Sequence, residues 1–266
     1  MKDTTTGKLS GSTCIVVPCY NEEGRLPLDH FARFLWNHED ALLCFVNDGS
    51  SDGTERVLKD FQKKYPDRIV VVSYTRNAGK AEAVLRGMQY GLKQTDCEYL
   101  AYLDADLATA PEECYEMTKE LSESIHFVFG SRIMKIGSVI DRRPYRFLVG
   151  RVIATFISKI LKMQVYDTQC GCKVFTRDLA AKVFTQPFVS RWLFDVEIFQ
   201  RCIILYGRDR VLNHMLEIPL RRWTDVGESK IKFTYFFKLW LDLYRIKRRY
   251  ASGRSERVFN PGLIEQ

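Results

Sequence analysis

The sequence lacks any uninterrupted apolar run of the roughly 18 to 20 residues that cross a bilayer. Its polar, threonine-rich start has no apolar core of the kind that marks a secretory signal. Glycine and proline are sparse, at 16 and 8 of 266 residues, and no repeat or low-complexity tract is present. These absences exclude disordered and fibrous classes and predict a cytoplasmic globular protein with no transmembrane segment.

Metal-binding cysteine patterns are lacking too. The eight cysteines lie mostly inside apolar stretches such as 14–19 and 42–46, which is typical of buried thiols. Cys170 and Cys172 form the only close pair, and no second pair or suitably spaced histidine completes a set of four ligands. The sequence therefore predicts free, buried cysteines and no zinc site.

From residue 13 to residue 132, short apolar runs rich in β-branched residues alternate with longer segments of helical spacing. This alternation is typical of an α/β fold with a mostly parallel, doubly wound sheet. After residue 132 we expect the strand rhythm to stop. The runs are 13–18, 41–47, 68–74, 98–103 and 126–131, and the helical segments are about 22–36, 52–64, 79–94 and 111–124.

Charged residues gather where the predicted strands end. Asp48 follows the second run, and Asp104 and Asp106 follow the fourth. Arg132 comes directly after the fifth. Because open α/β sheets bind ligands in the crevice beyond the carboxyl ends of their strands, this edge is the predicted site.

Asp104-Ala105-Asp106 places two carboxylates one residue apart. Mg²⁺ and Mn²⁺ favour such oxygen ligands, with substrate phosphates completing the coordination shell. A divalent ion held there would neutralise a departing diphosphate. An acidic surface turn is the alternative, but the position after a buried strand and beside other polar strand ends favours the metal site.

Two further loops suit a nucleotide. Asp48 can accept a hydrogen bond from a nucleobase N–H, and Gly49 lets the backbone approach the ligand closely. Asn77 and Lys80 stand in a short loop after the third run. This second loop is not a P-loop, because the glycine spacing is missing and Ala81 follows the lysine. A solvated turn is the alternative for both loops.

The chain resembles family 2 glycosyltransferases of the GT-A fold. The resemblance rests on four motifs in the family's order: VVPCYNEE at 16–23, VNDGSSDGT at 46–54, NAGK at 77–80 and DAD at 104–106. Later stretches are similar to dolichyl-phosphate and polyprenyl-phosphate hexosyltransferases, most closely the dolichyl-phosphate glucosyltransferase branch. These stretches are DTQCGCKVF at 167–175, RWLFDVE at 191–197 and GESK at 227–230, so that the resemblance covers about 13–231.

The resemblance implies a donor site for a nucleotide sugar, UDP-glucose before others, with a GDP-sugar left open. The base would lie near the first two strand ends, and a flap containing Lys230 would close over the donor. Trp223 and Ala108 depart from the pattern common in mannosyl-transferring relatives, which weakens a mannose assignment. The donor-binding residues so implied are Pro18, Tyr20, Glu22, Asp48, Asn77, Lys80, Asp104 and Lys230.

The same resemblance implies catalytic roles at the strand ends. Asp106, with Asp104 alongside, would hold Mg²⁺ or Mn²⁺. Arg132 would face a phosphate of the donor or the acceptor. Asp195 or Asp167 would orient an acceptor phosphate, which is largely ionised at neutral pH because its second pKa is about 6. The alternative for Asp195 is a structural role, as a carboxylate at a helix N-terminus that the helix dipole stabilises.

Two long amphipathic helices are predicted at 145–163 and 233–249. The second carries aromatic residues beside a basic stripe, which is typical of a helix lying on anionic headgroups. The formal net charge of +7 arises wholly from 221–257. Packing on the sheet, or on a second subunit of a homo-oligomer, is the alternative. We therefore expect a flexible N-terminus (1–12), a GT-A catalytic domain (13–231) and an amphipathic basic helix with a tail (232–266).

The sequence thus predicts an inverting, metal-dependent transferase that moves a hexose, glucose first, from a nucleotide-diphosphate sugar to a polyprenyl or dolichyl phosphate. The enzyme would sit peripherally on the inner face of the membrane and bind no nucleic acid. Three alternatives stay open. One is a transferase with a saccharide acceptor, and one is a nucleotidyltransferase, although the first loop lacks the glycines and arginines expected of it. The third is a basic nucleic-acid-binding protein, which would leave the strand-end carboxylates unexplained.

Overall fold

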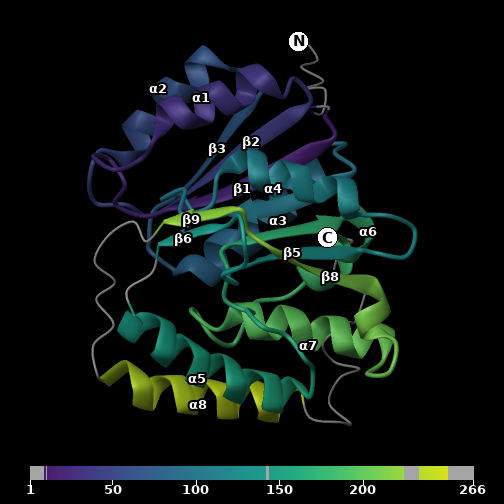
Figure 1. The fold of residues 1–266 in the computed structure, drawn as a ribbon. Helices are drawn as coiled ribbons and strands as arrows, with labels where there is room; N and C mark the ends of the chain where they lie inside the picture. Colours follow the sequence, from purple (N-terminus) through teal and green to yellow (C-terminus); the bar gives the residue numbers. More distant parts are fainter. Residues whose placement is uncertain (1–8, 10, 142–143, 225–233, 251–266) are drawn as a thin grey trace.

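The computed structural model describes residues 9, 11–141, 144–224 and 234–250 (Figure 1). A seven-stranded sheet in the order β3-β2-β1-β4-β7-β5-β8 forms the centre. All its neighbouring strands run parallel except β7, which is antiparallel to both β4 and β5. The strands are β1 Thr13–Cys19, β2 Ala41–Asp48, β3 Ile69–Tyr74, β4 Tyr99–Leu103, β5 Phe127–Ser131, β7 Cys172–Thr176 and β8 Met215–Pro219.

The five expected strands and the mostly parallel α/β sheet are confirmed. The expectation that strands stop after residue 132 is wrong, because β7 and β8 complete the sheet and β6 (Val139–Asp141) pairs with β9 (Arg222–Thr224). β6 and β9 are only three residues long, too short to show a clear period in sequence. β7 and β8 are as long as β4 and β5, but each holds a charged residue, Lys173 or Glu217, inside its apolar run.

Helices cover both faces of the sheet. The side chains of α1 (Leu28–Asn37), α2 (Thr54–Lys64) and α4 (Pro111–Glu116) bury into one apolar cluster, with the 3₁₀ helix η1 (Met117–Glu120). A second cluster on the other face takes α3 (Lys80–Gln94), α6 (Arg177–Val183) and α7 (Phe194–Tyr206), followed by the short η2 (Val211–His214).

Two predicted helices are shorter than expected. The segment expected at 22–36 becomes helical only at Leu28, because the N–H groups of Arg25 and Leu26 donate to the Glu22 carbonyl in a turn. The segment expected at 111–124 ends at Glu120, after a 3₁₀ turn.

The two amphipathic helices form the lowest layer of Figure 1, beneath α7. They are α5 (Pro144–Leu161) and α8 (Thr234–Arg249), close to the predicted bounds. α8 buries Leu239, Leu243 and Ile246 in the same cluster as α7. Within the described ranges, no helix combines the length and the apolar character that a membrane crossing requires.

Candidate active site

Asp104, just beyond β4, lies at the centre of the polar residues on the sheet's carboxyl edge. Its Oδ1 forms an ion pair with the Lys80 Nζ at 2.5 Å, and its N–H donates to the Gly171 carbonyl at 3.0 Å. A Cβ added to Gly171 would lie 2.0 Å from the Asp104 Oδ2, so only glycine leaves space for this carboxylate. The CGC sequence at 170–172, which leads into β7, therefore has a structural role beside the site.

Asp106 lies close to two other carboxylates. Burial raises its pKa, and the negative charge of Asp104 raises it further. Burial likewise raises the pKa of Glu22; Arg25 opposes that rise, while the charge of Asp106 adds to it. Carboxylates that disfavour one another's ionisation in this way create a place for a cation.

The pair fits a divalent metal held partly by substrate. Among the described residues, no group of three or more His, Cys, Asp or Glu side chains surrounds one metal position. Asp104 and Asp106 would therefore supply protein oxygens, and phosphate oxygens of a donor the others, which is the usual arrangement for Mg²⁺.

Asp48, at the end of β2, holds the loop that follows β3. Its Oδ1 accepts from the Ala78 N–H at 3.0 Å, and its Oδ2 accepts from the Gly79 N–H at 2.7 Å and from the Asn77 Nδ2 at 3.0 Å. Gly79, with φ +98°, then starts α3 at Lys80. Asp48 and Asn77 thus direct Lys80 toward the carboxylates. The Asp48 carboxylate can still accept a further hydrogen bond, from the N–H of a base.

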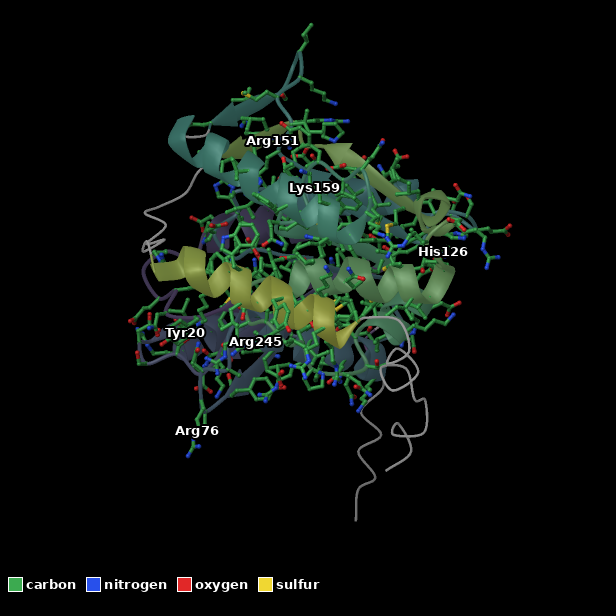
Figure 2. The ribbon with its side chains drawn as sticks, turned by 90° about the horizontal axis from the view of Figure 1, so that it is seen from below. Tyr20, Arg76, His126, Arg151, Lys159 and Arg245 are labelled. Carbon is green, nitrogen blue, oxygen red and sulfur yellow. The ribbon has the colours of Figure 1, made fainter. Side chains whose placement is uncertain are left out.

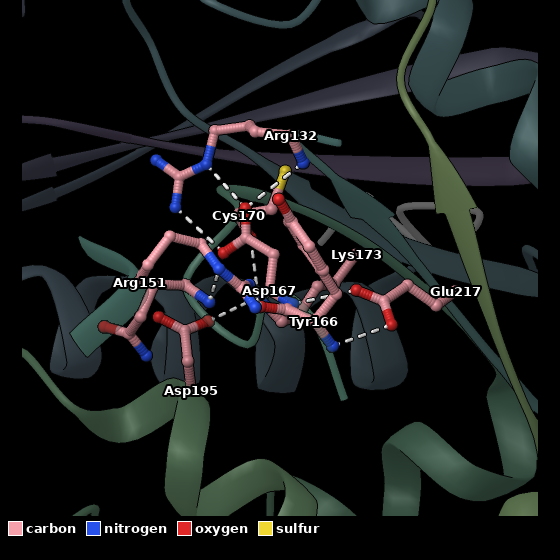
Figure 3. Close-up of polar contacts among 9 residues, drawn as sticks. Arg132, Arg151, Tyr166, Asp167, Cys170, Lys173, Asp195 and Glu217 are labelled. Carbon is pink, nitrogen blue, oxygen red and sulfur yellow. Dashed lines mark hydrogen bonds and ion pairs between the residues drawn. The ribbon is translucent and has the colours of Figure 1, made fainter. Parts of the chain in front are cut away.

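Arg132 and Asp167 form a buried, bidentate ion pair (Figure 3). The Arg132 Nε and Nη2 donate to the two Asp167 oxygens at 2.6 and 2.9 Å. Burial alone would raise the pKa of Asp167, but the Arg132 charge and hydrogen bonds lower it to about 2. Glu217 on β8 accepts from the Tyr166 and Asp167 N–H groups, so β8 fixes this pair beside the sheet edge.

Asp195, in the first turn of α7, is buried with partners from two strands. Its Oδ1 receives the Lys173 Nζ at 2.7 Å and also accepts from the Tyr102 hydroxyl. Burial raises the pKa of Tyr102, and the neighbouring Asp195 charge raises it further. Lys173, fully buried on β7, also donates to the Cys170 carbonyl at 2.6 Å. Asp195 is therefore held rigidly, close to Lys80, whose pKa its charge helps to raise.

The first loop shapes the outer part of the site. Asn21 connects it to the second loop, because its N–H donates to the Ser50 Oγ and its Oδ1 accepts from the Ser51 N–H. Pro18 is half-buried near the end of β1, and Tyr20 is exposed beyond it (Figure 2). Lys230 lies outside the described residues.

The family model for "Glycosyl transferase family 2" matches residues 14–184. The chain belongs to glycosyl transferase family 2. It is 31% identical to a dolichyl-phosphate beta-glucosyltransferase of Trichomonas vaginalis, over 91% of this chain and 72% of that protein. It is 31% identical to the dolichyl-phosphate beta-glucosyltransferase of Mus musculus, over 94% of this chain and 78% of that protein.

A solved structure shares the fold of this chain. Glucosyl-3-phosphoglycerate synthase from Mycobacterium tuberculosis, solved with Mn²⁺, uridine-diphosphate-glucose and glycerol 3-phosphate, superposes with a TM-score of 0.61 at 16% identity. The match covers 90% of this chain and 80% of that one. The predicted GT-A fold is confirmed, and the family 2 assignment supports a hexosyltransferase.

Several contacts of this family 2 site were not predicted. Lys173 and Tyr102 are the partners of Asp195, and Glu217 supports Asp167. A lysine inside the apolar run CKVF is the one available signal, since a buried strand accepts a lysine only with a partner. Tyr102 sits in an ordinary apolar strand and carries no such signal.

Proposed function

We propose that this family 2 enzyme transfers glucose, with inversion, from UDP-glucose to a polyprenyl or dolichyl phosphate. One observation carries the proposal. The carboxylates Asp104 and Asp106 and the cations Lys80 and Arg132 converge on one sheet edge, in a chain similar over nine-tenths of its length to dolichyl-phosphate beta-glucosyltransferases. Opposite charges in this arrangement suit a donor and an acceptor that both carry phosphate groups.

On the donor side, the base lies near Pro18, Tyr20 and Glu22, with Asp48 as its acceptor. Lys80, beside Asp104, would supply a positive charge to a donor phosphate. Mg²⁺ or Mn²⁺, held by Asp104 and Asp106, would supply charge neutralisation for the departing diphosphate.

On the acceptor side, a phosphate monoester needs no strong base, because it is already largely ionised at neutral pH. Arg132 offers its remaining guanidinium N–H groups to that phosphate. Asp195, fixed by Lys173 and Tyr102, orients the acceptor without taking its proton. In-line attack then depends on positioning more than on acid–base chemistry.

The lipid acceptor requires contact with a membrane, which we assign to α5 and α8. Both helices expose apolar side chains, including Phe156 and Trp240, whose ring centroids lie 4.6 Å apart. Figure 2 shows Lys159 on α5 and Arg245 on α8 on the underside of the molecule. Such a face suits peripheral attachment at the cytoplasmic leaflet, and a second copy covering it would instead make the protein a homo-oligomer.

The proposal is tested by incubating the protein with Mg²⁺ or Mn²⁺, a panel of radiolabelled nucleotide sugars and a polyprenyl phosphate. We expect lipid-linked glucose from UDP-glucose, and none after chelation of the metal. Asp106→Asn should lower the rate by about a hundredfold or more, because a metal oxygen is lost. Asp60→Asn, a change on the exposed surface of α2, is the matched control.

Two outcomes would overturn parts of the proposal. Transfer only to soluble saccharides would remove the lipid acceptor. An unchanged rate in Asp106→Asn would remove the metal role.

A further inference from the structure

The turn that follows β5 exposes three aliphatic side chains. We call residues 133–139 the β5–β6 tip. Ile136 is 104% exposed, Met134 63% and Val139 59%, and none belongs to either apolar cluster. Ile136 is the most exposed large apolar side chain in the described part of the chain.

Hydrogen bonds close the tip into an ordered turn. The Ser138 N–H and Oγ both donate to the Lys135 carbonyl, at 3.0 and 2.8 Å. The Lys135 N–H donates back to the Ser138 Oγ at 2.9 Å, and Gly137 takes the φ of +88° that the turn requires. The aliphatic side chains are therefore held outward by a defined backbone.

Both ends of the tip are rooted at the active site. One end begins directly after Arg132, and the other continues into β6, which pairs with β9. On β9, the Thr224 N–H donates at 3.2 Å to the carbonyl of Ala108, two residues beyond Asp106. The tip is thus connected at both of its ends to the edge of the sheet that carries the chemistry.

The exposed charged side chains near the apolar ones are mostly basic, with Asp141 at the end of β6 as the acidic exception. Lys135 is exposed between Met134 and Ile136, and Arg221 and Arg222 are exposed on the segment paired with β6. Aliphatic residues with a basic border are typical of contacts with anionic lipid, where the former enter the acyl region and the latter meet headgroups. A protein partner is less well matched, because a stable interface needs roughly 800 Å² per partner and this turn is seven residues long.

We propose that the β5–β6 tip inserts into an anionic lipid surface. The insertion would fix the distance between Arg132 and the lipid headgroups. A phosphate at headgroup level would then meet the sheet edge directly. This inference rests on the proposed lipid acceptor, and it adds a membrane contact at the active site itself, separate from α5 and α8.

A single label tests the insertion. All eight native cysteines are buried, so Ile136→Cys supplies one reactive thiol for an environment-sensitive fluorophore on the full chain. We expect a blue shift on adding vesicles of phosphatidylcholine and phosphatidylserine, and quenching by lipids labelled in the acyl chain. Leu212→Cys, 52% exposed in η2, is the matched control and should show neither. No shift at position 136, or one that appears with rising protein concentration alone, would overturn the proposal.

A polar variant separates this inference from the proposed function. Met134→Ser/Ile136→Ser should raise the Kd for these vesicles at least about tenfold, because two aliphatic side chains no longer enter the lipid. Transfer to a short, water-soluble isoprenyl phosphate should stay at the wild-type rate. Wild-type vesicle affinity in this variant would overturn the tip's role. If the wild type transfers glucose neither to a polyprenyl phosphate nor to the short isoprenyl phosphate, the proposed function is overturned. The vesicle measurement would still show whether the tip binds lipid.

Discussion

At the scale of single residues, the Arg132–Asp167 pair shows how burial and charge act together. Asp167 lies at 7% side-chain exposure, and without Arg132 burial would favour its neutral form. The bidentate contact reverses that preference. The pKa of Asp167 falls from its ordinary 3.8 to about 2, so its ionisation favours the folded state.

This shift predicts a loss of stability in acid. A carboxyl with a depressed folded-state pKa contributes its full stabilisation above the unfolded-state value and loses it as the pH falls toward the folded-state value. Relative to Arg132→Met/Asp167→Asn, the wild type should lose about 2 kcal/mol of unfolding free energy between about pH 5 and pH 2. Urea denaturation at a series of pH values measures the difference.

The double variant leaves neither charge buried without its partner, so it should fold. Asp60→Asn serves as the control, because the exposed ion pair of Asp60 with Lys63 is screened by solvent and contributes little to stability, so this variant should follow the wild-type profile closely. If the difference in unfolding free energy between wild type and double variant stays constant across this pH range, ionisation of Asp167 does not stabilise the folded state.

At the scale of elements, α8 is joined by polar contacts to the segment that leads into α7. The Ser190 Oγ donates to the Asp242 Oδ2 at 2.9 Å, and the Tyr250 hydroxyl donates to the Glu197 Oε2 at the same distance. The carbonyl of Arg191, in the same segment, accepts from the N–H of Ala81 at the start of α3. The helix we assign to the membrane is thus connected to the elements that carry Asp195 and Lys80.

Tyr250→Phe should weaken this connection. It leaves the buried Glu197 carboxylate and the Arg201 Nε each without one partner, which costs about 1–2 kcal/mol of unfolding free energy. Chemical denaturation followed by circular dichroism measures the cost. Tyr244→Phe, on the exposed side of α8, should be neutral. Equal stabilities for the two variants would argue against the connection.

The elements also show what a sequence can and cannot predict. β1 to β5 were predictable because each is an apolar run with polar residues at its end. The place of β7 between β4 and β5 was not, because it depends on pairing with strands far away in the chain. The same holds at the site: Asp104 is visible from its position after a strand, but the hydrogen bond from Tyr102 to Asp195 joins residues 93 positions apart.

At the scale of the whole molecule, charge is unevenly distributed. All of the net charge of +7 falls in 221–257, and α8 forms the lowest layer of the molecule (Figure 1). Lys238, Arg245 and Lys247 are among its exposed side chains. The rest of the chain is formally neutral, so attraction to an anionic surface would orient the molecule with α8 toward it.

Neutralising two of these charges should weaken that attraction. Lys247→Gln/Arg248→Gln removes about 2 kcal/mol of binding to phosphatidylserine vesicles, or about thirtyfold in Kd. Sedimentation with vesicles at increasing salt measures the loss. The gap between wild type and variant should narrow as salt screens the surface, and it should vanish on vesicles of phosphatidylcholine alone. A gap that persists on neutral lipid would show that the two side chains act otherwise than by charge.

The position of β7 also sets the order in which the site can be completed during synthesis. Residues 13–131 leave the ribosome first and contain β1 to β5, yet β4 and β5 have no ladder between them until β7 arrives. Gly171 and Lys173 arrive at that strand, so Asp104 gains its Gly171 neighbour only after residue 171 has emerged, and Lys173 gains Asp195 later still, once residue 195 has emerged. A nascent chain cut short before this point has the nucleotide-side loops but no finished catalytic edge.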